Sequence, residues 1–299
     1  MINLLKNCKL CPRNCGVNRL EGELGFCKSN ENIKLAKVSL HHWEEPCVSG
    51  KNGSGTVFFS NCNLRCVFCQ NHNISQESTG KEVSINRLSE IFLEQQNRGA
   101  HNINLVTPTH YVPQIIEALK IAKANGLNIP VLYNSNGYEN IETIEALKGY
   151  IDVYLPDLKY FNDKYAIKYS CAKDYFTKAS KAIEHMVAQV GKSQLDKDGL
   201  IKKGVIIRHL MLPGLLFDSK KLMDYIYTTF GDDVYISLMN QYTPMFNACK
   251  YPEINKPLNP KHYDALIDYC LELGITKAFI QGEGTSTPEF TPDFDLSGI

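Results

Sequence analysis

The segment Gly55-Thr-Val-Phe-Phe-Ser60-Asn-Cys62-Asn-Leu-Arg-Cys66-Val-Phe-Cys69-Gln-Asn71 joins a short apolar run to three closely spaced cysteines. The apolar run predicts a buried β-strand, and the cysteines after it have the spacing C-x3-C-x2-C. Three thiolates from one loop can hold three irons of a 4Fe–4S cluster and leave the fourth iron without a protein ligand. An open position lets a metal centre react, as in catalytic zinc sites. The segment therefore predicts a reactive cluster at a strand end, where an α/β barrel places its chemistry.

A structural zinc knuckle is the alternative interpretation of the same loop. It would use two or three of these cysteines together with His72. Zinc sites usually show four ligands in two paired clusters, whereas this loop has an unpaired triplet. The reactive-cluster interpretation is therefore favoured.

Length and composition limit the classes of protein to consider. The chain has 299 residues, 43% of them hydrophobic and 21% charged, which is typical of a globular protein. The formal net charge of zero argues against a nucleic-acid partner, and no apolar run approaches the roughly 20 residues of a membrane span. Cys8 comes too early for a signal-peptide core, and the 11 cysteines are clustered, so we expect reduced thiolates in the cytoplasm.

Strand-like and helix-like segments alternate after residue 50. This alternation predicts a parallel sheet, either a partial, open (β/α)6-type barrel or, as the alternative, a doubly wound open sheet. We expect residues 1–50 to form a cysteine-rich appendage and residues 51–299 the barrel, with an irregular tail after Gln281. The expected strands are Thr56–Ser60, Ile103–Thr107, Pro130–Asn134, Asp152–Asp157, Val205–Leu212, Tyr235–Asn240 and Lys277–Gln281. The expected helices are Ile85–Arg98, Val112–Asn125, Ile141–Leu147, Tyr175–Val190, Lys220–Phe230 and Pro260–Leu273.

The cysteine triad, with the aromatic Phe68 before its last member, resembles the signature of the radical S-adenosylmethionine (SAM) enzymes. Most of the chain is similar to one branch of that superfamily, the iron–sulfur proteins related to pyruvate formate-lyase activating enzyme. The segments that carry this resemblance are Cys8-Lys-Leu-Cys-Pro-Arg-Asn-Cys15, Gly53-Ser-Gly-Thr-Val-Phe-Phe-Ser60, Val106-Thr-Pro-Thr-His-Tyr111, Tyr133-Asn-Ser-Asn-Gly-Tyr138, Pro156-Asp-Leu-Lys-Tyr160, Arg208-His-Leu-Met-Leu-Pro-Gly214 and Pro292-Asp-Phe-Asp-Leu-Ser-Gly298.

The resemblance implies an enzyme with a 4Fe–4S cluster on Cys62, Cys66 and Cys69 and with SAM on the open iron. One electron then cleaves SAM to a 5′-deoxyadenosyl radical that abstracts hydrogen from a substrate. The resemblance also implies an electron donor such as flavodoxin or ferredoxin. The substrate stays open between a glycyl radical enzyme, which the chain would activate, and a peptide or small metabolite.

Residues at the ends of the predicted strands are the candidates for contact with SAM. The resemblance places Asn134, Ser135, Asn136, Asp157 and Lys159 there. Arg208 and His209 are neighbours on one predicted strand, so only one of them can face the lumen; arginine there would suit a carboxylate or a ribose oxygen, with His209 packed outside. Val106-Thr-Pro-Thr-His110 replaces the Gly-Gly-Glu strand end that holds the SAM amino group in activating enzymes. Thr107, Thr109 and His110 would then have to supply hydrogen-bond acceptors, which puts the activase function in doubt more than SAM binding.

A second set of cysteines precedes the predicted barrel. Cys8, Cys11, Cys15 and Cys27 have the spacing C-x2-C-x3-C-x11-C. Four thiolates form a closed set that suits either structural zinc or a second, fully ligated iron–sulfur cluster, and the spacing does not separate the two.

Two classes of function remain for the structure to address. One is a radical SAM enzyme, for which burial of Phe290 and Phe294 against the barrel would favour a small substrate under a lid. The other is a zinc-stabilised binding protein without catalysis, which predicts colourless protein with zinc at both cysteine sets.

Overall fold

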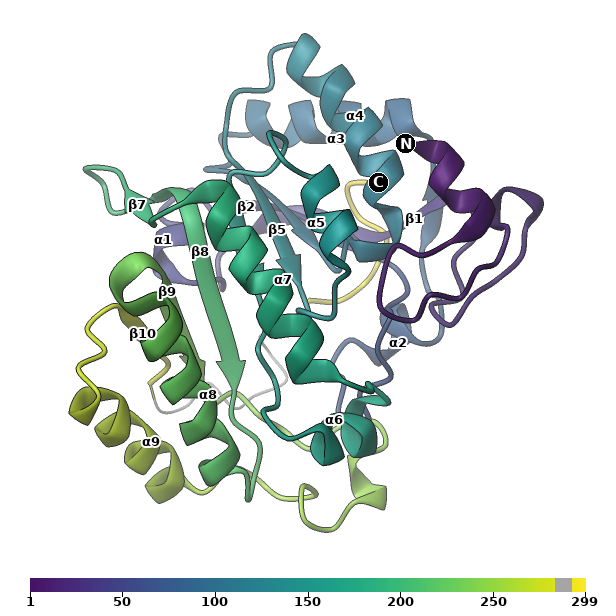
Figure 1. The fold of residues 1–299 in the computed structure, drawn as a ribbon. Helices are drawn as coiled ribbons and strands as arrows, with labels where there is room; N and C mark the ends of the chain where they lie inside the picture. Colours follow the sequence, from purple (N-terminus) through teal and green to yellow (C-terminus); the bar gives the residue numbers. More distant parts are fainter. Residues whose placement is uncertain (283–291) are drawn as a thin grey trace.

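A computed structural model describes residues 1–282 and 292–299, and its centre is one twisted sheet (Figure 1). The strands follow the order β10-β9-β8-β6-β5-β4-β2-β1-β3, and β7 pairs with β8. Their bounds are β1 (Ile33–His41), β2 (Ser54–Phe59), β3 (Lys81–Val83), β4 (Ile103–Val106), β5 (Val131–Ser135), β6 (Val153–Pro156), β7 (Gln194–Leu195), β8 (Ile201–Leu210), β9 (Tyr235–Met239) and β10 (Ala278–Ile280).

The strands from β2 to β10 along the main path are parallel, while β1 is antiparallel to β2 and β3 is antiparallel to β1. In the described part of the chain, β10 and β3 are the two edges and do not pair with each other, so the sheet is not closed. The predicted open barrel is therefore confirmed.

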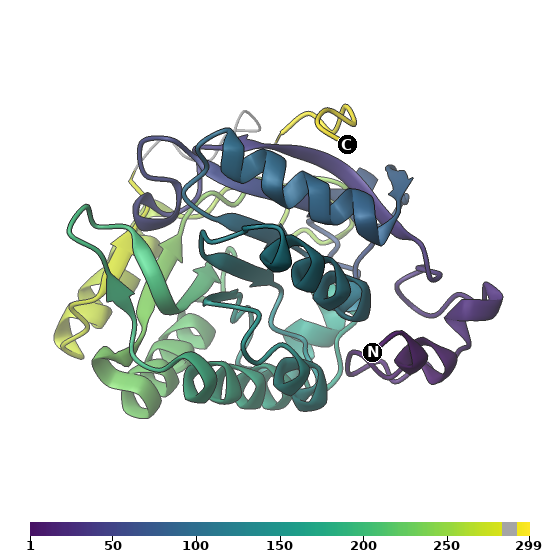
Figure 2. The same ribbon diagram turned by 90° about the horizontal axis from the view of Figure 1, so that it is seen from above.

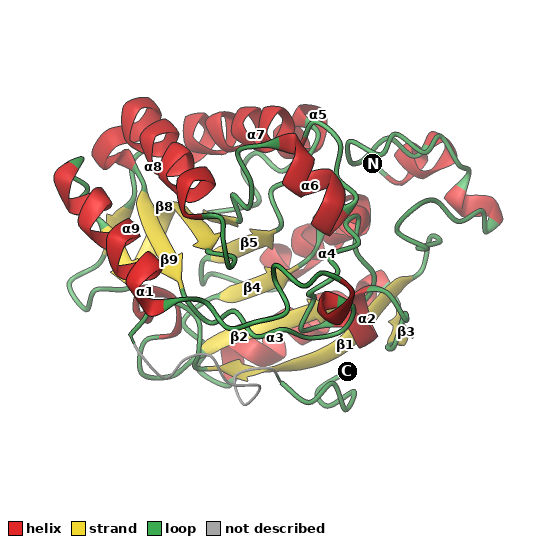
Figure 3. Cartoon of the chain, turned by 90° about the horizontal axis from the view of Figure 1, so that it is seen from below, coloured by secondary structure: helices red, strands yellow, loops and turns green. Residues whose placement is uncertain are grey.

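Helices cover the outer face of this sheet, as Figure 3 shows. In α7, for example, Ala179, Ile183, Met186 and Val190 follow helical spacing and are buried in the main core. Among the helices of the described residues, none is long and apolar enough to cross a bilayer. The helices are α1 (Pro46–Ser49), α2 (His72–Ser75), α3 (Ile85–Asn97), α4 (Val112–Ala124), α5 (Ile141–Ala146), α6 (Asp163–Ser170), α7 (Tyr175–Val190), α8 (Leu216–Phe230) and α9 (Pro260–Glu272).

The inner face of the sheet changes from apolar to polar along the strands. Leu132, Leu155 and Ile206 pack with Cys47 and Val48 of α1 and fill the lower part of the lumen. Side chains nearer the C-terminal strand ends are polar and are joined by hydrogen bonds, among them Asn104, Asn134 and Arg208. The packed lower part therefore leaves only the C-terminal end of the barrel for a polar site.

Neighbouring residues of β8 alternate between the two faces, as predicted. Arg208 reaches inward, while His209 is buried outside, with Nδ1 2.8 Å from the Leu158 carbonyl and Nε2 2.9 Å from the Ser219 hydroxyl. Burial lowers the pKa of His209 to about 4, so this histidine is a neutral core residue.

The strand β1 is missing from the elements that the sequence predicts. It lies within the predicted appendage of residues 1–50, so only residues 1–32 precede the sheet, and they lie beside the barrel in Figure 2. The pairing of β1 with β2 shifts register between Leu35 and Lys37, so the apolar residues change phase there. This bulge interrupts the period-two pattern by which strands are recognised. Division of the chain near residue 50 stays a prediction.

The described part of the C-terminal tail lies along β1. The amide of Val38 donates to the carbonyl of Ser297 at 2.9 Å, and Lys37 pairs with Asp295 at 2.9 Å. The Phe294 ring is half-buried, with its centroid 5.4 Å from that of Phe58. Phe290 lies outside the described residues.

Candidate functional site

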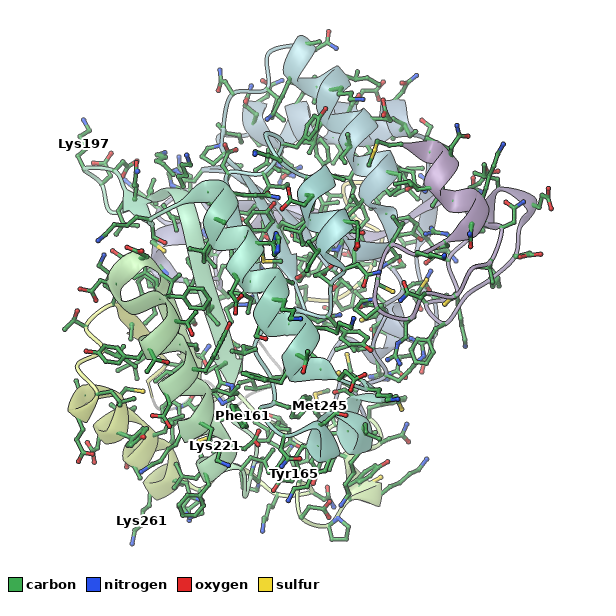
Figure 4. All side chains as sticks on the ribbon, viewed as in Figure 1. Phe161, Tyr165, Lys197, Lys221, Met245 and Lys261 are labelled. Carbon is green, nitrogen blue, oxygen red and sulfur yellow. The ribbon has the colours of Figure 1, made fainter. Side chains whose placement is uncertain are left out.

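The cysteine loop that follows β2 is pinned to the end of α6. The amide of Arg65 donates to the Ser170 carbonyl at 3.1 Å, and the amide of Val67 donates to the Tyr169 carbonyl at 2.9 Å. Phe68 is buried with its ring centroid 5.7 Å from that of Tyr242. These contacts hold the loop at the C-terminal end of the strands. Figure 4 shows Tyr165 and Met245 at this end of the molecule, with Lys197 at the opposite end.

Each sulfur of the loop has its own polar neighbour. The Asn136 amide nitrogen lies 3.4 Å from Cys62 Sγ, and the backbone amide of Leu64 lies 3.3 Å from the same atom. Cys66 Sγ lies 3.1 Å from the Ser170 hydroxyl, and Cys69 Sγ lies 3.3 Å from the Ser75 hydroxyl. Such groups stabilise negative charge on sulfur.

The cysteine pKa values bear on what the loop can bind. Burial raises the pKa of Cys62 to about 11 and that of Cys66 to about 12, and it also raises the pKa of Cys69. Thiolates at this place therefore need positive charge beside them, which metal ions supply.

Within the described residues, no three cysteine, histidine or carboxylate side chains already converge as ligands of one ion. Each thiolate of a cubane cluster binds a different iron, so a loop with three thiols and neighbouring hydrogen-bond donors fits such a cluster.

A cavity of about 200 Å³ opens beside Cys66 and Cys69. The side chains of Asp157, Lys159 and Arg208 line it from the ends of β6 and β8. The structure thus brings three of the predicted SAM contacts together with two of the three cysteines. The remaining lining comes from the cysteine loop and from the segment after β9: Phe68, Gln70, Asn71, Leu210, Met239, Gln241, Tyr242 and Thr243.

The charged residues of this cavity form one network. Asp157 Oδ2 lies 2.6 Å from Lys159 Nζ, and Asp157 Oδ1 lies 2.9 Å from Arg208 Nη2. Burial by itself would raise the pKa of Asp157, but the two cations outweigh it and lower that pKa. Burial likewise opposes the charge of Lys159, yet Asp157 raises its pKa. All three groups are therefore ionised at neutral pH.

A carboxylate from the segment between β1 and α1 extends this network. Glu44 Oε2 lies 3.3 Å from Arg208 Nη1, and Glu44 Oε1 accepts from the Asn134 amide at 3.3 Å and the Asn104 amide at 3.2 Å. Its position between β1 and α1 follows from the strand that the sequence pattern missed. Glu44 therefore joins the site through Arg208.

A second chamber of about 410 Å³ adjoins the first and shares Arg208, Met239 and Gln241 with it. Glu45 lines this chamber, and burial raises its pKa. Its Oε2 atom is buried without a hydrogen-bond partner in the part of the chain that the structure describes. The two chambers provide room for two molecules side by side.

The other predicted SAM contacts divide into two groups. Asn134 faces the lumen through its bond to Arg208, and the Asn136 amide lies at Cys62. Ser135, between them, is buried and accepts from the Gly137 amide at 3.3 Å, so it faces away from the lumen.

The predicted role of Thr109 and His110 as SAM contacts does not agree with their placement. Thr109 Oγ1 donates to Glu139 at 2.6 Å, and His110 Nε2 lies 2.8 Å from the Ser60 carbonyl behind the cysteine loop. The cause is Thr107, whose φ of +59° turns the chain before a 3₁₀ helix over Thr109–Tyr111. Thr107 itself is half-buried at the end of β4.

The second cysteine set gathers on the opposite side of His110. Cys8, Cys11, Cys15 and Cys27 line one small cavity together with that histidine. The structure thus places the four cysteines around one cavity, while their role as metal ligands and the identity of the metal stay predictions.

Comparisons with known proteins agree with this geometry. The family model described as "Radical SAM superfamily" matches residues 56–226. The uncharacterized protein MJ0674 of Methanocaldococcus jannaschii is 34% identical over 276 residues, which is 89% of this chain and 75% of that protein. The pyruvate formate-lyase-activating enzyme of Clostridium pasteurianum is 28% identical over 187 residues, which is 58% of this chain and 68% of that protein.

Solved structures share the fold at low identity. Streptococcus suis SuiB bound to S-adenosylmethionine has a TM-score of 0.52 and 15% identity over 77% of this chain and 50% of that chain. The hydrogenase maturase HydG of Carboxydothermus hydrogenoformans also has a TM-score of 0.52 and 15% identity, over 74% of this chain and 50% of that chain. This chain thus spans about half the length of these two structures.

Proposed function

The chain belongs to the radical SAM superfamily, and we propose that it is an enzyme that binds SAM beside Cys66 and Cys69 and abstracts hydrogen from a substrate held in the adjoining chamber. A reduced 4Fe–4S cluster on Cys62, Cys66 and Cys69 would supply the electron that cleaves SAM to methionine and a 5′-deoxyadenosyl radical. The chain's own residues would orient SAM and substrate around that cluster.

One observation carries the proposal: the cavity of about 200 Å³ joins two cysteines of the loop to a buried array of fixed charges. SAM carries an ammonium, a carboxylate and a sulfonium, so its recognition needs both signs of charge. Lys159 and Arg208 would bind the carboxylate, and Asp157 would accept from the ammonium. Asn134 and Asn136 offer amides to the ribose hydroxyls.

The chamber of about 410 Å³ suits a small molecule or one residue of a peptide. The half-buried Phe294 packs on Phe58 of the barrel, which is the described part of the burial expected for a small substrate. Activation of a glycyl radical enzyme is the second candidate, because the relative in Clostridium pasteurianum has that activity in its name. The chain departs from the activating enzymes at Val106–His110, which supports the first candidate.

The central test is production of 5′-deoxyadenosine. Protein purified without oxygen is analysed for iron and sulfide, then incubated with dithionite and SAM. We expect product from the native chain and none from Cys66→Ala, because loss of one thiolate removes a cluster ligand. Cys249→Ala, at an exposed cysteine outside the C-x3-C-x2-C triad, is the matched control and should keep full activity.

Three results would contradict the proposal. They are product from Cys66→Ala equal to that of the native chain, native protein without bound iron, and colourless protein with zinc at both cysteine sets. The last result would support a zinc-stabilised binding protein. A glycyl radical signal from a partner enzyme, seen by electron paramagnetic resonance only when the chain is present, would select the activase candidate.

A further inference from the structure

The N-terminal cysteines line one small cavity, although within the described residues their side chains do not yet converge as ligands of one ion. Cys8, Cys11, Cys15 and Cys27 line a cavity of about 10 Å³, close to the size that one water molecule needs. This small volume favours one metal ion over a cluster of four irons and four sulfides. Gly25 allows the close packing, because a Cβ atom there would lie 2.9 Å from Cys15 Sγ. The Phe26 amide also donates to that sulfur at 3.3 Å.

A buried histidine with an unpaired nitrogen points to the same conclusion. His110 is 2% exposed and lines the cavity of the four cysteines. Its Nε2 lies 2.8 Å from the Ser60 carbonyl, which can only accept, so Nε2 carries the hydrogen and Nδ1 keeps a lone pair. Nδ1 is buried and has no hydrogen-bond partner within the described residues. Histidines beside metals often bond a carbonyl in this way through the other ring nitrogen.

The charge around the cavity also favours a metal site. Arg19 is fully buried, and its guanidinium donates to the carbonyls of His110 at 2.6 Å and Asn30 at 3.0 Å. In the described part of the chain, no carboxylate forms an ion pair with Arg19. Its Nη1 lies 3.9 Å from Cys8 Sγ. Thiolates around one divalent ion carry net negative charge, which would balance this arginine.

We propose that this segment binds one zinc-type divalent ion and that the ion braces the catalytic cysteine loop. The four cysteines and His110 Nδ1 are the available donors, and the ion draws four of them onto itself. The first half of the proposal is independent of the proposed function. The second half rests on it, because it assigns the cluster to Cys62, Cys66 and Cys69.

The bracing contacts come from residues next to the metal ligands. Arg13, between Cys11 and Cys15, donates from Nε to the Asn63 carbonyl at 2.9 Å and from Nη1 to the Cys171 carbonyl at 2.6 Å. Asn63 lies in the cysteine loop, and Cys171 follows the serine that contacts Cys66. An ion that fixes the backbone around Arg13 therefore also fixes the two hydrogen bonds by which Arg13 holds the cysteine loop, to the carbonyls of Asn63 and Cys171.

A second contact joins the two segments in the other direction. Arg65, inside the cysteine loop, donates to the carbonyl of Phe26, the residue before Cys27. The guanidinium groups of Arg13 and Arg65 both lie over the Phe26 ring, at 3.7 and 4.6 Å from its centroid. Leu5, Leu10 and Cys27 are the buried apolar side chains of residues 1–32. So few apolar contacts cannot order this segment, which makes a metal the natural source of its stability.

Metal analysis of the full chain tests whether the N-terminal segment binds one zinc-type ion. Native protein should hold one zinc per chain besides the iron and sulfide of one cluster. Cys66→Ala should lose iron but keep its zinc, so failure of the proposed function does not hide the zinc site. Cys11→Ser with Cys27→Ser should lose the zinc, while Cys249→Ser should keep both metals. Native protein without zinc, or with iron for two clusters, would overturn the single-ion site.

The lifetime of the iron–sulfur cluster tests whether the bound ion braces the catalytic cysteine loop. The rate at which the visible cluster absorbance decays under an iron chelator should rise at least about fivefold in the zinc-free double variant. Arg13→Gln should keep its zinc and show the same faster decay, because it removes the brace and leaves the ligands. Arg13→Gln therefore still tests the brace if the double cysteine variant does not fold. Decay at the native rate in Arg13→Gln would overturn the brace.

Discussion

Arg208 Nη2 lies 2.9 Å from Asp157 Oδ1 at the single parallel bridge that joins the ends of β6 and β8. Beyond Val153 and Tyr154, the register of these two strands gives no further ladder pair, so the ion pair and this bridge connect their ends. Because Asp157 also pairs with Lys159, one carboxylate contacts two buried cations at the rim of the cavity, and Glu44 is a second anion beside Arg208.

Replacing Asp157 with asparagine should therefore be costly. The change leaves Lys159 and Arg208 buried beside each other with Glu44 as the nearest remaining anion. Breaking a buried ion pair from one side typically lowers the free energy of unfolding by about 3–5 kcal/mol. Denaturant unfolding should show a loss in that range. The exposed pair Arg87–Glu94 is the matched control, and Glu94→Gln should cost less than about 1 kcal/mol. Equal losses in the two variants would contradict this prediction.

The hydroxyl of Ser170 should tune the electron transfer of the site. A ligated thiolate has no proton, so the hydroxyl 3.1 Å from Cys66 Sγ must donate to it. Removing a bond worth about 0.5–1.5 kcal/mol destabilises the more negative, reduced cluster and lowers its potential by about 20–60 mV. A redox titration followed by electron paramagnetic resonance should show this shift in Ser170→Ala. Ser180→Ala in α7, whose hydroxyl bonds a backbone carbonyl, should leave the potential unchanged.

Glu139 should make stability depend on pH. Burial raises its pKa from 4.5 to about 7, although hydrogen bonds from Thr109, Ser135 and Tyr133 oppose this rise. Between these two values the folded chain keeps a proton that the unfolded chain has released, so stability falls as pH rises. The unfolding free energy should drop by up to about 2 kcal/mol from about pH 5.5 to about pH 8.

Glutamine at position 139 supplies the control, since it is neutral and can still accept from Thr109. Glu139→Gln should remove this part of the pH dependence and should exceed the native chain in stability at about pH 8. A variant with the native slope would show that another group is responsible.

Thr107 combines strain with proximity to the site. Its φ of +59° is unfavourable for a β-branched residue by about 1–2 kcal/mol. Thr107→Gly should therefore raise the unfolding free energy by up to about 1 kcal/mol, after the entropy gain of the unfolded chain is subtracted. Thr177→Gly in the first turn of α7, where the backbone is helical, should instead lower it by about 0.3–0.5 kcal/mol. If the strain positions the strand end for SAM, Thr107→Gly should also raise the KM for SAM, and a native KM would exclude that role.

The sequence predicted most of the barrel because its elements follow simple periodicities. Helix α7 has the predicted bounds Tyr175–Val190, and Arg208 and His209 divide between the faces as alternation requires. The strand β1 was missed because its bulge changes the phase of the pattern. Helix α8 begins at Leu216 rather than Lys220, since a cap turn carries no periodic signal.

The site was predicted only in part, for reasons of geometry. The strand-end residues Asp157, Lys159 and Arg208 line one cavity because parallel strands end on the same side, while their contact with SAM stays a prediction. The hydroxyls of Ser75 and Ser170 could not be foreseen, since each depends on where a loop returns in space. Thr109 and His110 were misplaced because one left-handed residue redirects the chain before them.

The hydrogen bond between Arg13 and the Cys171 carbonyl joins residues that are synthesised at very different times. Its carbonyl partner at Cys171 is made 158 residues later, which takes about 10–30 s at ordinary translation rates. A newly made cysteine loop thus emerges from the ribosome well before its support exists. Iron delivered before Cys171 is made would meet an unsupported loop, so cluster insertion should follow synthesis of that residue.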